Sequence, residues 1–251
     1  RKLTDKELQK ATDDKNKSVR AERTAMRQRV LSQIATEDWD GIIISHNMFK
    51  RIPMSKEATK QFIQEQIDEM RSAIIELSSA NDKSGKRLVK ELEKKASAKE
   101  AELKEAINEE GKDIVIPFEQ LGIDQIFVDE ADLFKNLGFA TKMNRIAGLS
   151  TTNSQRSTDM FMKTQYITKM NGGRGVVFAT GTPISNTMAE MFTMLRYLDM
   201  QGLKDKNMSF FDNWASNFAV HEPTVERSPD GNGYRQTEKF TSFTLKCSIY
   251  K

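Results

Sequence analysis

The sequence contains little cysteine, histidine or proline. Among its 251 residues there are one cysteine, Cys247, two histidines, His46 and His221, and five prolines. A single cysteine excludes an internal disulfide and any zinc site built from several cysteines, and it fits a reducing, cytoplasmic setting. The balance of 37% hydrophobic and 30% charged residues excludes a largely disordered chain and is typical of a globular protein with long charged helices.

The sequence also lacks a membrane segment and an export signal. No stretch approaches the roughly 18 consecutive apolar residues of a membrane span, and no signal-peptide pattern opens the chain. The 39 basic and 36 acidic residues leave a net charge of +3, which is too small to argue for nucleic acid by itself. Because the chain starts at Arg1 inside a charged helical pattern, without methionine, we expect a piece of a longer protein.

The first part of the chain is polar and is predicted to be helical over residues 5–35. Its arginines crowd together, and they are Arg20, Arg23, Arg27 and Arg29. They form either a solvated helical face, which we favour, or a patch that faces phosphate groups. The apolar run WDGIIIS comes next, bounded by Gly41 and Ser45, and it predicts a short buried strand.

Residues 55–111 differ in composition from their surroundings. They are rich in Glu, Lys, Ala, Gln and Leu, with apolar residues at helical spacing, and the pattern is interrupted at residues 81–85. This pattern predicts two antiparallel helices, each about 40 Å long. Since the patterns before and after are of another kind, we expect this helical hairpin to be an insertion into a domain.

The later sequence alternates short apolar runs with amphipathic stretches. IDQIFVDE and RGVVFATGT predict strands, and ISNTMAEMFTMLRYL predicts the helix after the second strand. This order indicates an α/β fold with a parallel sheet. Further along, NMSFFDNWASNF predicts a helix, residues 227–234 predict a hairpin or long loop, and TSFTLKCSIYK shows no clear element.

Two unusual turns follow the predicted strands. Asp129 and Glu130 come directly after the first strand, and Thr180, Gly181 and Thr182 come after the second. Because the carboxyl ends of parallel strands meet at one edge of a sheet, we expect these residues to lie together. One carboxylate there can hold hydrated Mg²⁺ and a second can deprotonate an attacking water. The alternative is that both acids only stabilise the positive end of a helix.

These turns belong to two motifs, FVDEADLFKNL and FATGTPISN, which together resemble motifs II and III of superfamily II helicases. Lys135 and Asn136 after the acids, and the Thr-Gly-Thr-Pro of the second motif, are similar to the Swi/Snf-type branch of DNA translocases. IIISHNMF is similar to motif Ib of that branch. Over residues 39–220 the chain resembles the helicase part of large phage, plasmid and conjugative-element proteins that join a DNA adenine methylase to a Swi/Snf-type helicase. Residues 241–251 do not fit that pattern.

The resemblance implies a fold and a domain organisation. The fold would be part of a RecA-like (P-loop NTPase) parallel sheet with flanking helices and an inserted long helical hairpin. Residues 1–54 would start this lobe, 55–111 would be the insertion, 112–220 would complete the lobe with motifs II and III, and 221–251 would form a hairpin or loop tail.

The resemblance also implies roles for single residues. Asp129 would bind Mg²⁺ through water, Glu130 would polarise the water that attacks ATP, and Asp132 would contact motif III. Thr180, Gly181 and Thr182 would couple hydrolysis to movement. The residues near the DNA backbone would be Ser45, His46, Lys135 and Asn136. For His46, a loop position without a role is an equal alternative.

The sequence contains no phosphate loop, which an ATPase of this kind needs to cradle the phosphates of ATP. In the family, this loop precedes motif Ib, and a second RecA-like domain with an arginine finger follows motif III. We therefore expect a fragment of an ATP-dependent DNA translocase that alone neither binds ATP tightly nor hydrolyses it. Its cofactors would be ATP and Mg²⁺, and its partners DNA and the rest of the parent chain. The competing hypothesis is a non-enzymatic DNA- or protein-interaction module that uses the helical hairpin.

Overall fold

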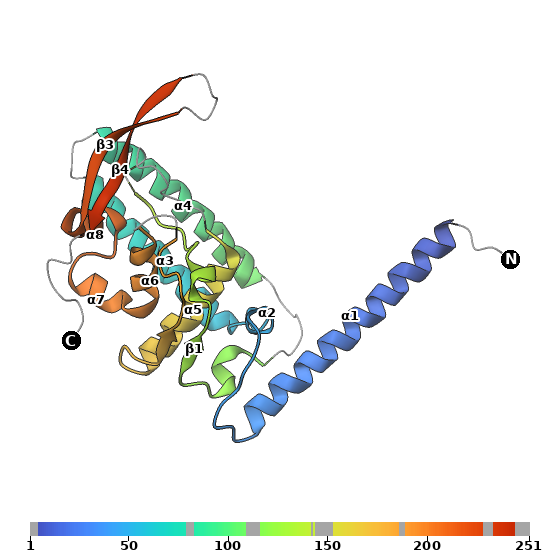
Figure 1. Cartoon of the computed structure of the whole chain (residues 1–251). Coiled ribbons are helices and arrows are strands. Elements are labelled where there is room, and N and C mark those ends of the chain that lie inside the picture. Colours follow the sequence, from blue (N-terminus) through green and yellow to red (C-terminus); the bar gives the residue numbers. More distant parts are fainter. Residues whose placement is uncertain are drawn as a thin grey trace. The chain divides into compact units, whose positions relative to one another are not determined.

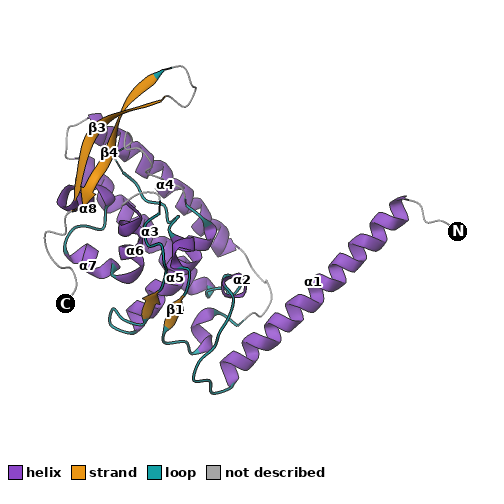
Figure 2. Ribbon diagram, in the orientation of Figure 1, coloured by secondary structure: helices purple, strands orange, loops and turns teal. Residues whose placement is uncertain are grey.

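The computed structural model describes residues 5–78, 83–108, 116–141, 143, 153–185, 189–227 and 233–243 (Figure 1). These residues form eight α-helices, two short 3-10 helices, one parallel and one antiparallel pair of strands (Figure 2). The mixed α/β class is therefore confirmed. The chain divides into two compact units, the first of Arg1–Ser55 and Gly111–Ile123, and the second of Lys56–Glu110 and Asp124–Lys251. No helix in the described ranges is long and apolar enough to cross a membrane.

The first unit contains the long polar helix α1 (Asp5–Thr36), which confirms the helix expected over residues 5–35. Leu31 is the only buried residue among those of α1 whose side chains are described. Arg23 is exposed, and Arg27 turns back along the helix, where its Nε donates a hydrogen bond to the Arg23 carbonyl oxygen at 3.0 Å. This geometry fits a solvated helical face.

The strand predicted at WDGIIIS does not form, and that prediction was wrong. Residues 41–45 have no regular secondary structure, and Ile43 is fully exposed. A strand needs a neighbour to pair its backbone N–H and C=O groups and to cover its side chains. No described strand pairs with this run, so its apolar composition does not lead to burial.

Two short helices complete the first unit. α2 (His46–Phe49) follows the apolar run. η1 (Phe118–Leu121) comes after residues 56–110 in the sequence but belongs to the first unit. The Phe118 ring packs edge-on against Phe49, with ring centroids 5.8 Å apart. This contact joins segments that are distant in the sequence.

The second unit contains the predicted parallel strands. β1 (Ile126–Val128) pairs in parallel with β2 (Val176–Phe178), and α5 (Gln155–Met170) lies between them in the sequence as the crossover helix. Gly175 enters β2 with φ +95°, and a Cβ there would lie 2.8 Å from the carbonyl oxygen of Asp124. The turn into β2 therefore requires glycine.

Three helices follow β2 in the described part of the chain, and two of them were predicted. They are α6 (Ala189–Leu198), α7 (Met200–Asp205) and α8 (Phe211–Phe218), and the first and last confirm the predictions from ISNTMAEMFTMLRYL and NMSFFDNWASNF. They pack through an aromatic core, which consists of Phe139, Phe192, Phe211, Trp214 and Phe240. Rings in such edge-on and offset contacts contribute beyond the apolar area that they bury.

An antiparallel hairpin follows α8. β3 (Ala219–Arg227) pairs with β4 (Tyr234–Phe243), and Arg227 is the partner of Tyr234, so the two strands form the expected hairpin, whose residues 228–232 lie outside the described ranges. Residues 241–243, for which the sequence indicated no clear element, belong to β4, and residues 244–251 lie outside the described ranges. Pairing with β3 and the burial of Phe240 in the aromatic core explain why β4 extends this far.

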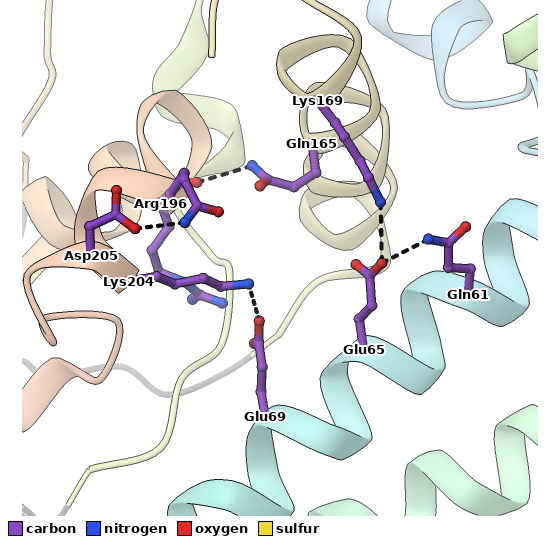
Figure 3. A network of polar contacts seen from close by, with 9 residues as sticks. Gln61, Glu65, Glu69, Gln165, Lys169, Arg196, Lys204 and Asp205 are labelled. Carbon is purple, nitrogen blue, oxygen red and sulfur yellow. Dashed lines mark hydrogen bonds and ion pairs between the residues drawn. The ribbon is translucent and has the colours of Figure 1, made fainter. Parts of the chain in front are cut away.

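The two expected helices form as α3 (Lys56–Ser78) and α4 (Lys83–Asn108), which lie side by side (Figure 1). α3 also contacts the rest of its unit through ion pairs from Glu65 to Lys169 of α5, with 3.4 Å between the charged atoms, and from Glu69 to Lys204 of α7 (Figure 3). These pairs are largely exposed, so each contributes little to stability. That the two helices are an insertion into a lobe stays a prediction.

The aromatic core gives the first testable prediction. Phe192 is fully buried, so Phe192→Ala would leave a cavity and lower the free energy of unfolding by about 3–5 kcal/mol, measured by urea denaturation. The control is Met191→Ala, its exposed neighbour on α6, for which we expect a change below about 1 kcal/mol. Similar losses for both variants would contradict this packing.

Candidate active site

The two motifs leave the parallel strands at the same edge of the sheet. Val128 and Phe178, the last residues of β1 and β2, are partners in the register. Beyond them the Ala179 N–H donates to the Val128 carbonyl oxygen at 2.8 Å, and the Ala131 N–H donates to the Ala179 carbonyl oxygen at 3.1 Å. The backbone bonds thus hold the two turns together past the end of the strands.

The two acids at this edge are exposed. The Asp129 carboxylate accepts a hydrogen bond from the Glu130 N–H at 3.0 Å. The Glu130 carboxylate makes no hydrogen bond or ion pair with any residue that the structure describes. Hard carboxylate oxygens that face solvent suit a hydrated Mg²⁺ ion. No group of three or more His, Cys, Asp or Glu that could hold a metal occurs in the described ranges, so an ion here would rely on water and phosphate for its other ligands.

The backbone of Glu130 is in a left-handed conformation, with φ 52° and ψ 45°. For a residue with a Cβ this conformation costs about 1–2 kcal/mol, and such strained residues are common at functional sites. Glu130 precedes the one-turn helix η2 (Ala131–Phe134) but makes no side-chain capping bond to it. The geometry therefore favours a role other than helix capping for this acid.

A side-chain hydrogen bond joins the two motifs. The Thr180 hydroxyl donates to Asp132 Oδ1 at 3.0 Å and accepts from the Thr182 N–H at 3.1 Å. The structure thus places Asp132 against the second motif, with one hydroxyl group linking η2 to the turn after β2. Gly181 and Thr182 are exposed beside it. A displacement of either turn would stretch or break this bond.

Lys135 and Asn136, which follow η2, differ in their surroundings. The Lys135 ammonium lies 3.4 Å from a carboxylate oxygen of Glu190 and is hydrogen bonded to the Ser185 hydroxyl. The Asn136 residue is exposed, and its carbonyl oxygen accepts a hydrogen bond from the Ser154 N–H at 2.9 Å. Lys135 is thus engaged within the protein, whereas Asn136 faces solvent.

Helix α6 supports the loop after η2 with residues that the sequence analysis did not select. The buried Tyr197 hydroxyl lies 3.0 Å from the carbonyl oxygen of Phe134, and Arg196 Nη1 donates to the carbonyl oxygen of Gly138 at 3.0 Å. Burial lowers the pKa of Arg196 to about 10 and raises the pKa of Tyr197. The signal available in the sequence was the presence of polar groups, including Glu190, in the otherwise apolar helix AEMFTMLRYL.

Ser45 and His46 belong to the first unit, while the acids and threonines belong to the second. The Ser45 hydroxyl accepts a hydrogen bond from the Met48 N–H at 3.3 Å and so caps α2. His46 is the first residue of that helix and is partly buried. Ser45 thus has a local structural role in the first unit.

Comparison with known proteins gives a family and one partial relative. A family profile described as a probable helicase domain matches residues 14–247 of this chain. Defense against restriction protein B of Escherichia phage P1 is 35% identical over 83 residues, a stretch that covers 32% of this chain and 4% of that protein. The chain therefore corresponds to only a small part of this relative. No solved structure matches this chain.

The link between the two motifs can be tested by Thr180→Val. This change removes the hydroxyl between Asp132 and Thr182 with little change in shape, so we expect the free energy of unfolding to fall by about 1–3 kcal/mol in urea titrations. Thr182→Val is the matched control, because Thr182 contributes its backbone N–H and not its hydroxyl to this link. An equal or larger effect of Thr182→Val would contradict the arrangement.

The backbone strain at Glu130 gives a prediction of opposite sign. Glu130→Gly relieves the left-handed conformation and removes no described contact, so stability should stay unchanged or rise by up to about 1 kcal/mol. The same replacement at Glu93, an exposed residue within α4, should lower stability by about 1 kcal/mol. Thermal unfolding of both variants distinguishes the cases, and a loss at Glu130 as large as that at Glu93 would exclude strain.

Proposed function

Because the chain belongs to the family of probable helicase domains that its residues 14–247 match, we propose that it is part of an ATP-dependent DNA translocase. The observation that carries this proposal is the junction of the two motifs. The exposed acids Asp129 and Glu130 follow β1, and Asp132 accepts a hydrogen bond from Thr180 after β2. In this arrangement, the loss of a phosphate group next to the acids would alter the position of the turn after β2.

The acids have distinct roles in this proposal. Asp129 holds hydrated Mg²⁺ through water, and Glu130 orients and deprotonates the water that attacks the γ-phosphate of ATP. The bound ion would neutralise charge on the phosphate oxygens. Support comes from the exposure of both carboxylates and from the Glu130 carboxylate, which has no partner in the described part of the chain. A general base must be free to reach a water molecule.

Thr180, Gly181 and Thr182 couple hydrolysis to movement. Asp132 lies on the same one-turn helix that follows Glu130, and its carboxylate is bonded to the Thr180 hydroxyl. A shift of the acids on loss of phosphate therefore changes the position of the turn after β2. That turn precedes α6 in the sequence, so a change in its position would also displace α6.

The proposed partner is DNA, contacted through its backbone without sequence preference. Asn136 is exposed and able to donate to a phosphate oxygen, and Ser45 and His46 are proposed contacts from the first unit. The Lys135-Asn136 pair and the Thr-Gly-Thr-Pro sequence favour the Swi/Snf-type branch, which tracks along duplex DNA. Similarity to a phage protein named for defense against restriction supports a place in a large phage or mobile-element protein. That this protein is of the methylase-helicase kind rests on the motif resemblance alone.

The test is Glu130→Gln in the longer protein that carries this chain together with a phosphate loop. We expect DNA-stimulated ATP hydrolysis to fall at least about 100-fold, since a positioned general base contributes about 10²–10⁴-fold, while DNA binding is retained. Glu222→Gln, an exposed position on β3, is the control and should leave hydrolysis unchanged.

Two results would contradict the proposal. One is ATP hydrolysis that persists in Glu130→Gln. The other is ATP hydrolysis by the longer protein that neither duplex nor single-stranded DNA stimulates. The 251-residue chain alone contains no phosphate loop and should show no Mg²⁺-dependent hydrolysis. Turnover by this chain that Glu130→Gln abolishes would show that expectation to be wrong, and DNA or protein binding by α3 and α4 without any hydrolysis would favour the interaction module.

A further inference from the structure

We propose that Lys135 and Glu190 form a positioning ion pair that holds the loop after η2 against the loop after β2. This assigns Lys135 a place inside the protein, in contrast to the DNA-backbone contact that the family resemblance implies. The effect of the pair on hydrolysis rests on the proposed function, whereas the pair itself does not. Glu190 then becomes a residue on which the geometry of the candidate active site depends.

The Lys135 side chain is held within the protein. It directly follows η2, and its side chain is only 19% exposed. Its ammonium group lies 3.4 Å from Glu190 Oε1 and is hydrogen bonded to the Ser185 hydroxyl. To reach a DNA phosphate, this ammonium would have to leave both the Glu190 carboxylate and the Ser185 hydroxyl.

Glu190 is buried and binds both loops. Its side chain is 9% exposed, and it lies in the first turn of α6. Its Oε2 accepts hydrogen bonds from the Ser185 N–H at 2.7 Å and from the Ser185 hydroxyl at 3.4 Å. A single buried carboxylate therefore holds the loop after β2 with one oxygen and Lys135 with the other. Removing the Glu190 charge leaves the mostly buried Lys135 ammonium without this counter-charge, and removing Lys135 takes a cationic partner from a buried carboxylate, so both changes are unfavourable.

Helix α6 makes this contact part of a larger support. Tyr197 and Arg196 of the same helix contact the backbone at Phe134 and Gly138, on either side of Lys135. Those two hydrogen bonds reach the end of η2 and the loop after it. Glu190 differs because it also binds the loop after β2, so it sets the spacing across which Thr180 reaches Asp132.

The experiment is a double-mutant cycle with Lys135→Met, Glu190→Gln and both together, plus the charge exchange Lys135→Glu with Glu190→Lys. Unfolding of the 251-residue chain is measured first. We expect each single change to raise the unfolding equilibrium constant at least about tenfold, the double variant to be no worse than the poorer single variant, and the exchange to recover part of the loss. Lys206→Met, at an exposed lysine, is the control and should have little effect.

The longer protein supplies readouts that distinguish positioning from DNA contact. If Lys135 positions the site, kcat for ATP hydrolysis falls in both single variants and partly recovers in the charge exchange, with KM for ATP little changed. The dependence of DNA affinity on salt stays the same. If Lys135 instead binds a DNA phosphate, Lys135→Met lowers the slope of log affinity against log salt concentration by about 1, while Glu190→Gln leaves this slope unchanged. That result would overturn the proposal.

Additive single effects on unfolding would also overturn the ion pair, because independent residues do not couple. A wild-type longer protein without DNA-stimulated hydrolysis would contradict the proposed function. In that case, coupling measured by unfolding of the 251-residue chain would still support the contact between Lys135 and Glu190. The two failures can therefore be told apart.

Discussion

The parallel pairing of β1 with β2 is the constraint on which the candidate active site depends. Each strand has only three residues, but their register sets Val128 beside Phe178, so the two turns start at the same level. A slip by one residue would move Thr180 away from Asp132 and reverse which side chains face the helices. Two strands alone are marginally stable in water, so packing of α5 and α6 must maintain this register.

Local patterns predicted the elements whose formation depends on local sequence. The apolar runs that became β1 and β2, and the helical spacing of α3, α4 and α6, were visible because side-chain periodicity repeats within each segment. The expected parallel strands predicted that the two turns would meet, whereas the contact of Asp132 with the second motif was implied by the family resemblance. The catalytic roles of these residues and the branch of the family stay predictions.

The features that the sequence did not predict depend on distant neighbours. WDGIIIS has the composition of a buried strand, yet burial requires a paired strand that its own residues cannot supply. Residues 241–243 show the reverse case, because pairing with β3 makes a strand of residues that carry no clear signal. The Lys135–Glu190 contact joins residues from different elements, and no pattern within either segment could indicate the other partner.

The aromatic core gives α6 little freedom to move by itself. Phe192 of α6 contacts Phe211 and Trp214 of α8, and Phe211 contacts Phe240 of β4. Close-packed interiors are nearly incompressible, so rings in contact shift as a group. A displacement of α6 would therefore require the contacting rings, including Phe240 of the β3–β4 hairpin, to repack. The helix that supports the site and the hairpin that follows α8 therefore share one packed core, so a substitution in either element changes the packing of the other.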